Sequence, residues 1–302
     1  MYEEVIHQIQ DLNQKLIDHD VYAGGLGYYK ILDEIPFAQT RNVYFTICLE
    51  DQKKYLIEFA HDLDAVDLQK YLRRALFLMV LEHEKGLITA KDFSIDPSRC
   101  FMVMDWVEGV NLQSILRHKK LNLRESLCIL ADLTYALEHL GEFGFVHRNI
   151  TPNCITIQKG TGRSFLGGVE YVTLSDFVHT RLEVNDFYSS PELVRSMIFP
   201  DYDLPLTPWS DIYSIGAIFY QMIMGEPPFP KHKNLIKWTK RPPIPRIESP
   251  LLSRRERKYC QELINNTMHR NFLKRWSPLK IRGYIMAYLE DVPREKDMER
   301  WI

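Results

Sequence analysis

HRNITPNCI, residues 147–155, is the most informative stretch of this chain. It places His147 and Arg148 directly before Asn149, and Cys154 lies near its end. An aspartate at the position of Asn149 could accept a proton near neutral pH, but an amide has no oxygen that titrates there. The sulfur of Cys154 is a soft ligand and therefore binds magnesium poorly. The loop therefore has neither a carboxylate base at Asn149 nor a hard oxygen ligand at Cys154.

Further stretches follow this loop in a fixed order. They are LSDF at 174–177 with Val178 after it, SPELV at 190–194, SDIYSIGAIFYQMIMGEPPF at 210–229 and KRWSP at 274–278. The series resembles the catalytic loop, the D-F-G motif, the A-P-E motif, the long buried helix and the partner arginine of protein kinases. The resemblance covers about residues 28–290. It implies an α+β, bilobal protein kinase-like fold, with a small antiparallel N-lobe carrying one main helix and a larger, mostly helical C-lobe.

The first half of the chain fits the same template. Residues 28–59 are expected to form three antiparallel strands, because apolar residues alternate from Val43 to Leu49. The loop glycines of the family would fall at three positions occupied by other residues, which are Pro36, Ala38 and Arg41. Glycines let backbone amides approach phosphates closely, so this loop is expected to lack the usual phosphate cover. GGLG, residues 24–27, precedes the first of these strands and is interpreted as a flexible turn.

Two charged positions are reversed relative to the family. The strand lysine corresponds to Glu58, and the glutamate of the following helix corresponds to Arg74. We hypothesise a Glu58–Arg74 ion pair in place of the Lys–Glu pair, which would put a carboxylate where phosphates bind in kinases. Two alternatives remain open: both side chains point to solvent, or Arg74 turns inward and substitutes for the lysine.

The positions that match the family are mostly structural. Those that resemble its framework are His147, Phe177 and Leu78 of the hydrophobic column between lobes, Asp211 below the catalytic loop, and the pair Glu192 and Arg275. The degenerate positions are Glu58, Arg74, Asn149, Thr151 and Cys154, so no catalytic residue is expected. Residual nucleotide contacts are restricted to Arg74, Met104 as gatekeeper, and Asp176. Asp176 is also a weak candidate for a metal ligand, although a hydrogen-bonded structural role is the competing interpretation.

Taken alone, the sequence predicts a pseudokinase that is not an enzyme and needs no cofactor. It would act as a scaffold or allosteric regulator of a protein partner, such as an active kinase or another enzyme. One alternative is a nucleotide-responsive switch that binds ATP weakly without transfer. A second alternative is a kinase-fold enzyme with unrelated chemistry.

The composition limits the expected classes of partner and the expected cellular location. The chain has 302 residues and a net charge of −2, which favours neither nucleic acid nor membrane as a partner. Five cysteines without paired spacing suggest reduced thiols and a cytoplasmic location. Residues 1–20 carry an apolar stripe at helical spacing. It is expected either to pack on its own lobe or to dock a partner or a second copy, as in a homodimer.

The expected domain organisation is a helical extension at 1–27, an N-lobe at 28–107 and a C-lobe at 108–302. Leucines recur at spacings of three and four within 122–144, which predicts a helix facing the core. The apolar run from Ile212 to Met224 predicts a helix buried on all sides and stopped by Pro227 and Pro228. Tyr188, Ser189 and Ser190 are candidates for modification.

Overall fold

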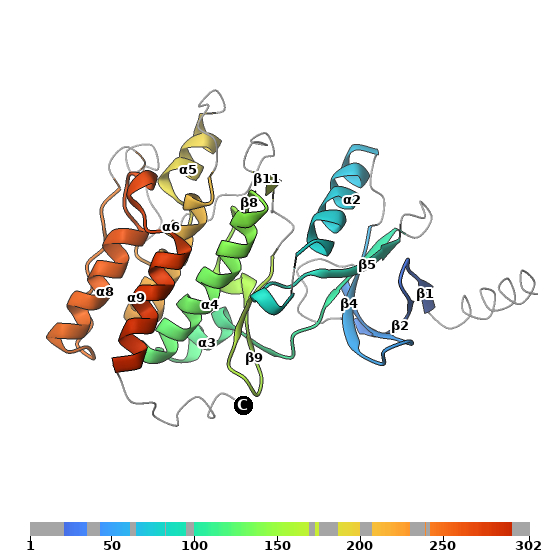
Figure 1. Ribbon diagram of the computed structural model, residues 1–302, viewed down its shortest axis with the longest axis horizontal. Coiled ribbons are helices and arrows are strands. Elements are labelled where there is room, and N and C mark those ends of the chain that lie inside the picture. The colour runs from blue at the N-terminus through green and yellow to red at the C-terminus, as the bar shows by residue number, and fades with distance from the viewer. Residues whose placement is uncertain are drawn as a thin grey trace, which may run out of the picture. The chain divides into compact units, whose positions relative to one another are not determined.

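The computed structural model describes residues 21–34, 43–60, 65–81, 83–94, 100–168, 173–174, 187–199, 207–229, 239 and 242–291. The chain divides into two compact units (Figure 1). Unit 1 comprises Met1–His83 and Ile88–Trp106, and unit 2 comprises Glu84–Leu87 and Val107–Ile302. None of the helices in the described part of the chain has the length and apolar character needed to span a membrane.

Unit 1 contains a sheet of six antiparallel strands in the order β1-β2-β3-β4-β6-β5. The strands are β1 Val21–Ala23, β2 Tyr28–Glu34, β3 Val43–Cys48, β4 Lys54–Phe59, β5 Ala90–Ser94 and β6 Phe101–Asp105. The three strands expected over residues 28–59 are β2, β3 and β4. β1 corrects the expected helical extension at 1–27, because Val21 pairs with Lys30 of β2 and so brings part of that segment into the sheet.

One face of this sheet holds an aromatic core. It is built from Tyr29, Cys48, Tyr55, Ile57, Phe59, Phe101 and Val103. Along β3 the buried side chains are Thr46 and Cys48, while Val43, Phe45 and Ile47 of the opposite face are only half-buried. Thr46 fits the interior because its hydroxyl donates to the carbonyl of Lys30 at 2.8 Å.

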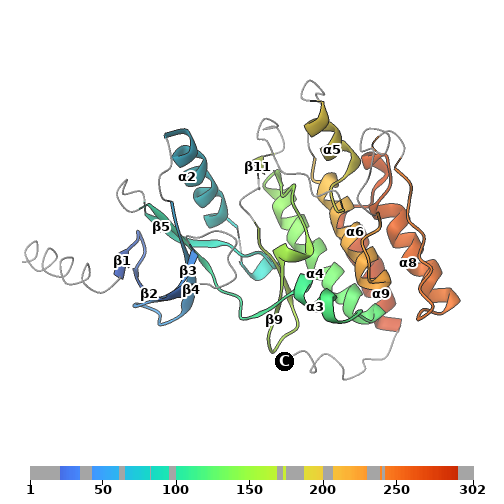
Figure 2. The same ribbon diagram turned by 180° about the vertical axis from the view of Figure 1, so that it is seen from behind.

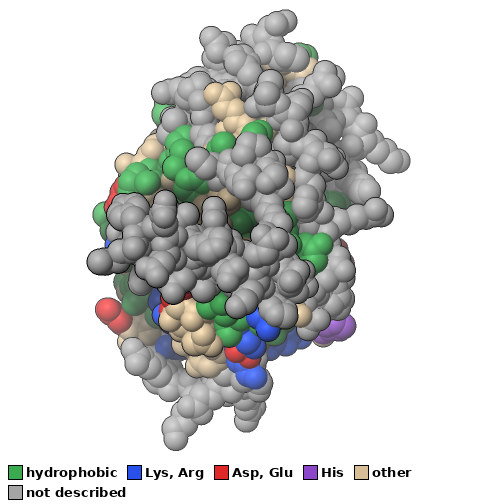
Figure 3. All heavy atoms as spheres, turned by 90° about the vertical axis from the view of Figure 1, so that its right-hand side faces the viewer, with side chains coloured by type: hydrophobic (Ala, Val, Ile, Leu, Met, Phe, Trp, Pro, Cys, Tyr) green, Lys and Arg blue, Asp and Glu red, His purple; other side chains and the backbone are tan. Residues whose placement is uncertain are grey.

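Some apolar side chains of unit 1 remain at the surface. Leu26, Leu32 and Leu49 are exposed. Figure 3 shows hydrophobic side chains reaching the surface on the face that it presents.

Helix α2, Ala65–Met79, packs against β5 within unit 1. Its buried side chains Tyr71, Ala75 and Leu78 recur at spacings of four and three, which places them on one side of the helix. Leu78 thus contributes to the core of unit 1. The exposed side chain of Leu76 lies between them in sequence and points to the opposite side.

Over its described residues, unit 2 is mainly helical, with two small antiparallel sheets. Its elements are β7 Gly109–Asn111, α3 Leu112–His118, α4 Leu123–Glu142, β8 Phe145–Val146, η2 Pro152–Cys154, β9 Ile155–Gln158, β10 Ser164–Leu166, β11 Thr173–Leu174, α5 Pro191–Ile198, α6 Trp209–Met224, α8 Arg254–Thr267, η4 Phe272–Lys274 and α9 Pro278–Asp291. Figures 1 and 2 show α4, α6, α8 and α9 running side by side within this unit.

Helix α4 is the centre of unit 2 and packs against both α6 and α9. A capping box defines its start, because Asn122 and Glu125 each bind the backbone amide of the other. The predicted leucine stripe is buried throughout. Its members are Leu127, Leu130, Leu133, Leu137 and Leu140.

Helix α6 is buried nearly all round, as its sequence predicts. Gly216 allows close packing on α8, because a Cβ there would lie 2.4 Å from Oγ1 of Thr267. The predicted end at Met224 is confirmed, but a glycine cap before Pro227 and Pro228 terminates the helix. The helix ends at Met224, where Gly225 adopts φ 86° and donates its amide to the carbonyl of Gln221.

Candidate active site

The loop after β8 is held by a carboxylate from α6. Oδ2 of Asp211 accepts a hydrogen bond from the amide of His147 at 2.7 Å, and Oδ1 accepts one from the amide of Arg148 at 2.9 Å. Arg148 has φ 69°, a left-handed conformation that costs a non-glycine residue about 1–2 kcal/mol. The two hydrogen bonds that the Asp211 carboxylate accepts therefore stabilise a strained loop backbone.

Burial has the largest effect on the pKa values of Asp211 and Arg148. It raises the pKa of Asp211 to about 7, although the two amide hydrogen bonds and the charge of Arg148 favour the carboxylate and oppose the rise. Burial lowers the pKa of the Arg148 guanidinium, and the charge of Asp211 works in the opposite direction. The two hydrogen bonds from the amides of His147 and Arg148 agree with the structural role expected of Asp211 from its motif position.

His147 is a buried, neutral member of the loop. Its Nε2 donates to the carbonyl of Gly167 at 2.8 Å. Burial lowers its pKa to about 4, so the ring carries no charge at neutral pH. Of the other residues expected in the hydrophobic column, Leu78 is buried in unit 1, and Phe177 lies outside the described residues.

The structure brings three of the degenerate positions together. The Cys154 thiol donates to the backbone carbonyl of Asn149 at 3.3 Å and lies 3.5 Å from Oγ1 of Thr151. Gly168 follows β10 with φ 72°, and a Cβ there would lie 2.7 Å from the Cys154 sulfur. The thiol therefore fills the space against the Gly168 backbone.

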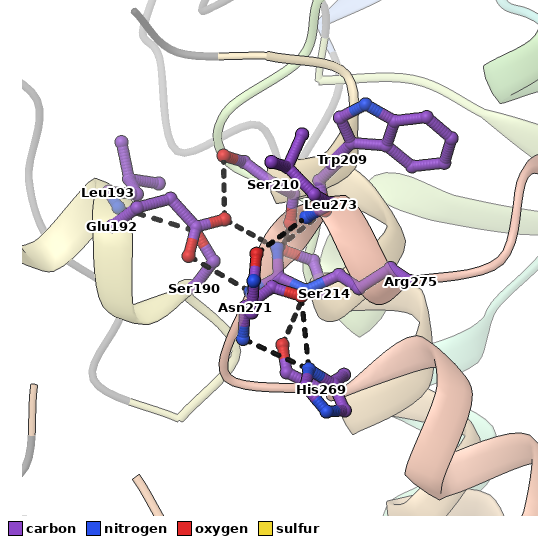
Figure 4. A network of polar contacts seen from close by, with 10 residues as sticks. All are labelled: Ser190, Glu192, Leu193, Trp209, Ser210, Ser214, His269, Asn271, Leu273 and Arg275. Carbon is purple, nitrogen blue, oxygen red and sulfur yellow. Dashed lines mark hydrogen bonds and ion pairs between the residues drawn. The ribbon is translucent and has the colours of Figure 1, made fainter. Parts of the chain in front are cut away.

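A buried ion pair braces α5 against the segment after α8 (Figure 4). Glu192 and Arg275 interact through two hydrogen bonds, Nη1–Oε1 at 2.5 Å and Nη2–Oε2 at 2.9 Å, as their motif positions predict. Arg275 also donates to the carbonyls of Trp209 at 2.7 Å and His269 at 2.9 Å. Ser210 adds a hydrogen bond to Glu192 at 3.1 Å. Both charges are well satisfied, as burial requires.

The candidate modification sites beside α5 are buried. Tyr188 donates its hydroxyl to Oε1 of Gln221 at 2.6 Å. Ser190 is the N-cap of α5 and accepts from the amide of Leu193 at 3.3 Å. In this structure two of the three hydroxyls therefore already serve structural contacts, and Ser189 is also buried.

The reversed charge pair of unit 1 is present. Nη2 of Arg74 on α2 lies 2.5 Å from Oε2 of Glu58 on β4. The guanidinium also lies 5.1 Å from the ring centre of Tyr71, whose hydroxyl donates to the backbone carbonyl of Glu58 at 2.7 Å. The hypothesised ion pair is confirmed, and the alternatives of two solvent-facing side chains or an inward-turned Arg74 are not observed. Met104 lies half-buried on β6.

The backbone amides of the GGLG turn bind the side-chain carboxylate of Asp92. Oδ1 of Asp92 accepts from the amide of Gly25 at 3.0 Å, and Oδ2 accepts from the amide of Leu26 at 2.8 Å. Oδ2 also accepts from the hydroxyl of Tyr29 at 2.9 Å. Asp92 lies on β5, far away in sequence, and nothing in its local pattern indicates this role.

A second network at the end of β6 was also not anticipated. Oδ2 of Asp105 accepts from the hydroxyl of Thr89 at 2.5 Å and lies 3.3 Å from Nδ1 of His83. Burial would raise the pKa of Asp105, but hydrogen bonds from His83 and Thr89 outweigh it and hold that pKa below its ordinary value.

Several expected site residues lie outside the described residues. These are Pro36, Ala38, Arg41, Asp176, Phe177 and the segment 1–20. Over the ranges that are described, no three His, Cys, Asp or Glu side chains are grouped so as to hold a metal. The five cysteines are free thiols.

Comparison with known proteins shows what this architecture is similar to. The family model for the protein kinase domain matches residues 39–284. The chain is 28% identical over 165 residues to serine/threonine-protein kinase 36 of Pongo abelii, covering 54% of this chain and 12% of that protein. It is 26% identical over 213 residues to serine/threonine-protein kinase PrkC of Bacillus subtilis, covering 67% and 31%. Aurora kinase C of Mus musculus is 23% identical over 202 residues, covering 64% and 65%.

These relatives correct the prediction that the chain is not an enzyme. That prediction came from Asn149 and Cys154, yet the matched family model is a kinase domain and the relatives are named as kinases. The match spans less than two thirds of the length of each relative described above.

The family model includes parts of both units, from residue 39 before β3 to residue 284 within α9. The antiparallel sheet with α2, the helical second unit, the Asp211-held loop and the Glu192–Arg275 pair all agree with it. The chain belongs to the protein kinase family.

Proposed function

We propose that this chain is a protein-serine/threonine phosphotransferase of low intrinsic rate, and that it regulates a protein partner through its kinase domain. The loop of residues 147–155 carries the proposal, because its backbone is built and held by Asp211 while an amide occupies the position of the base. The named relatives are serine/threonine kinases, which supports the choice of reaction.

Kinase chemistry explains why loss of the base need not abolish transfer. Phosphoryl transfer depends mainly on positioning and on electrostatic stabilisation of the phosphates. A general base contributes a factor of about 10²–10⁴ in rate. The amide oxygen of Asn149 can still accept a hydrogen bond from a substrate hydroxyl and orient it. A slow reaction is therefore the chemical consequence of this loop.

In unit 1 the carboxylate of Glu58 forms an ion pair with Arg74. Its pairing with Arg74 places a guanidinium beside the carboxylate, so a phosphate approaching this region meets a pair with no net charge. The strand lysine of the family is nevertheless missing, which is a second reason to expect weak nucleotide binding.

The decisive experiment restores the base. Purified wild-type protein, Asn149→Asp and the matched control Asn149→Ala are assayed for incorporation of labelled phosphate into a generic protein substrate with Mg·ATP. The aspartate variant is expected to be about 10²–10⁴ times faster than the wild type, and the alanine variant slower. If the wild type equals Asn149→Ala and the aspartate brings no gain, the proposed reaction is refuted.

The regulatory half of the proposal concerns a protein partner. It is supported by a contrast within the chain. The framework residues Asp211, Glu192 and Arg275 keep their hydrogen bonds and ion pair, whereas the loop of residues 147–155 has lost catalytic residue types. The free cysteines favour a reducing, cytoplasmic setting. Co-purification of the tagged chain from its native host, compared with a tagged unrelated kinase domain, tests this half. Failure to enrich any protein specifically would contradict it.

A further inference from the structure

A groove of about 500 Å³ lies at the surface of unit 2, between α8 and the extended segment 242–250. Figures 1 and 2 both show α8 at the outer margin of this unit. The α8 side chains that line the groove recur at helical spacing and share one face; they are Arg254, Arg257, Lys258, Gln261 and Asn265. The other wall comes from residues 244 and 246–248.

Gln261 fixes the two walls to each other. Its Oε1 accepts from the amide of Ile247 at 2.9 Å, and its Nε2 donates to the carbonyl of Pro245 at 3.1 Å. A capping box of Ser253 and Glu256 sets the start of α8. The groove is thus formed by a capped helix and a hydrogen-bonded segment, so its shape is largely pre-formed.

The groove is strongly cationic. Its lining includes Arg246, Arg254, Arg257 and Lys258 against a single carboxylate, Glu248. Among the residues that the structure describes, none of these four cations forms an ion pair with another side chain. Cations that gather without internal partners attract an anionic ligand.

The wall segment also limits how a ligand can bind. Three of its prolines, at 242, 243 and 245, have no amide hydrogen, so an added strand would find few donors there. Ile244 is 37% exposed at the rim and offers an apolar contact beside the charged side chains. Side chains rather than backbone must therefore recognise the ligand.

We infer that this groove docks an acidic peptide segment of a protein partner, in which an apolar residue is flanked by aspartates or glutamates. The apolar residue contacts Ile244, and the carboxylates pair with the arginines and Lys258. The inference rests on the proposed partner binding and assigns it a surface. The phosphotransfer assay can succeed or fail independently of it.

The test uses fluorescence anisotropy with the full chain. The probe is a fluorescein-labelled peptide in which one leucine lies between runs of aspartate and glutamate, and the control peptide carries asparagine and glutamine instead. The groove variant combines Arg254→Glu with Lys258→Glu, two exposed positions. A glutamate in the first turn of α8 also suits the positive helix end, so folding should be retained. The matched charge control combines Arg117→Glu with Lys159→Glu, which are exposed elsewhere on unit 2.

We expect the acidic peptide to bind the wild type and the charge control equally, and the groove variant about tenfold more weakly. Raising the salt concentration should weaken the wild-type complex. Equal binding of the neutral peptide, or equal loss in both variants, would overturn the inference. An oligothymidine of matched charge that binds as tightly as the acidic peptide would overturn it too, and would assign the groove to nucleic acid.

Discussion

Exchanging the charges of Glu58 and Arg74 tests whether this pair holds α2 on the sheet of unit 1. The variants are Glu58→Lys, Arg74→Glu and the double exchange, which restores the orientation found in the family. The two side chains are 22% and 16% exposed, and their charged atoms lie 2.5 Å apart. They therefore interact in a medium of intermediate dielectric, where two unit charges about 4 Å apart contribute about 4 kcal/mol.

Each single variant places like charges together. Part of the repulsion is relieved by solvent and by movement of the long side chains. We therefore expect each to lower the free energy of unfolding by about 3 kcal/mol, the lower end for breaking a buried pair. The double variant regains the attraction but loses the contact of Arg74 with the Tyr71 ring, worth about 0.5–1 kcal/mol. It should lie within about 1 kcal/mol of the wild type.

The assay must report on unit 1, because a chain of two units need not unfold in one step. Hydrogen exchange of the amides of α2 and β4, measured in increasing urea, reports the local free energy of opening. The neutral variant Glu58→Gln serves as a control and should lose less than either reversal. If the double variant is no more stable than the less stable of the two single variants, the ion pair does not hold the helix on the sheet.

Three further predictions concern the framework. Arg275→Met leaves the buried carboxylate of Glu192 with Ser210 but without its arginine, and should lower the free energy of unfolding by about 3–5 kcal/mol. The double variant Glu192→Leu with Arg275→Met should recover much of that loss. No recovery would show that the unpaired buried charge is not the cause. The pKa of His147 is about 4 in the fold and about 6.5 unfolded, so the native state binds fewer protons between these values. The stability of the wild type relative to His147→Phe should therefore fall by about 3 kcal/mol as pH drops from about 6.5 to 4 in denaturation series, and a constant difference would refute the assignment. Asp92→Asn replaces one acceptor oxygen by a donor that faces either the Gly25 amide or the Leu26 amide, and should cost about 1–3 kcal/mol, with faster amide exchange at Gly25 and Leu26; unchanged exchange would contradict this.

Local patterns predicted much of the architecture. The leucine spacing of residues 122–144 indicated α4, and the apolar run from Ile212 indicated a helix buried all round. The contacts Glu58–Arg74 and Glu192–Arg275 followed from motif positions, because a family template carries long-range contacts with it. The chemistry of Asn149 misled the prediction about enzyme activity, since one side chain does not determine what the family does.

The sequence by itself determined the order of the elements, the kinase template and the residues that occupy its catalytic positions, because periodicity and motif spacing are local properties. Tertiary structure decided which face of β3 is buried, that Asp92 binds the amides of the GGLG turn, and that the cations of α8 meet the segment 242–250. Each of these depends on partners far apart along the chain. A hydrogen bond or a charge cluster of this kind forms only when folding brings together groups that no sequence window contains.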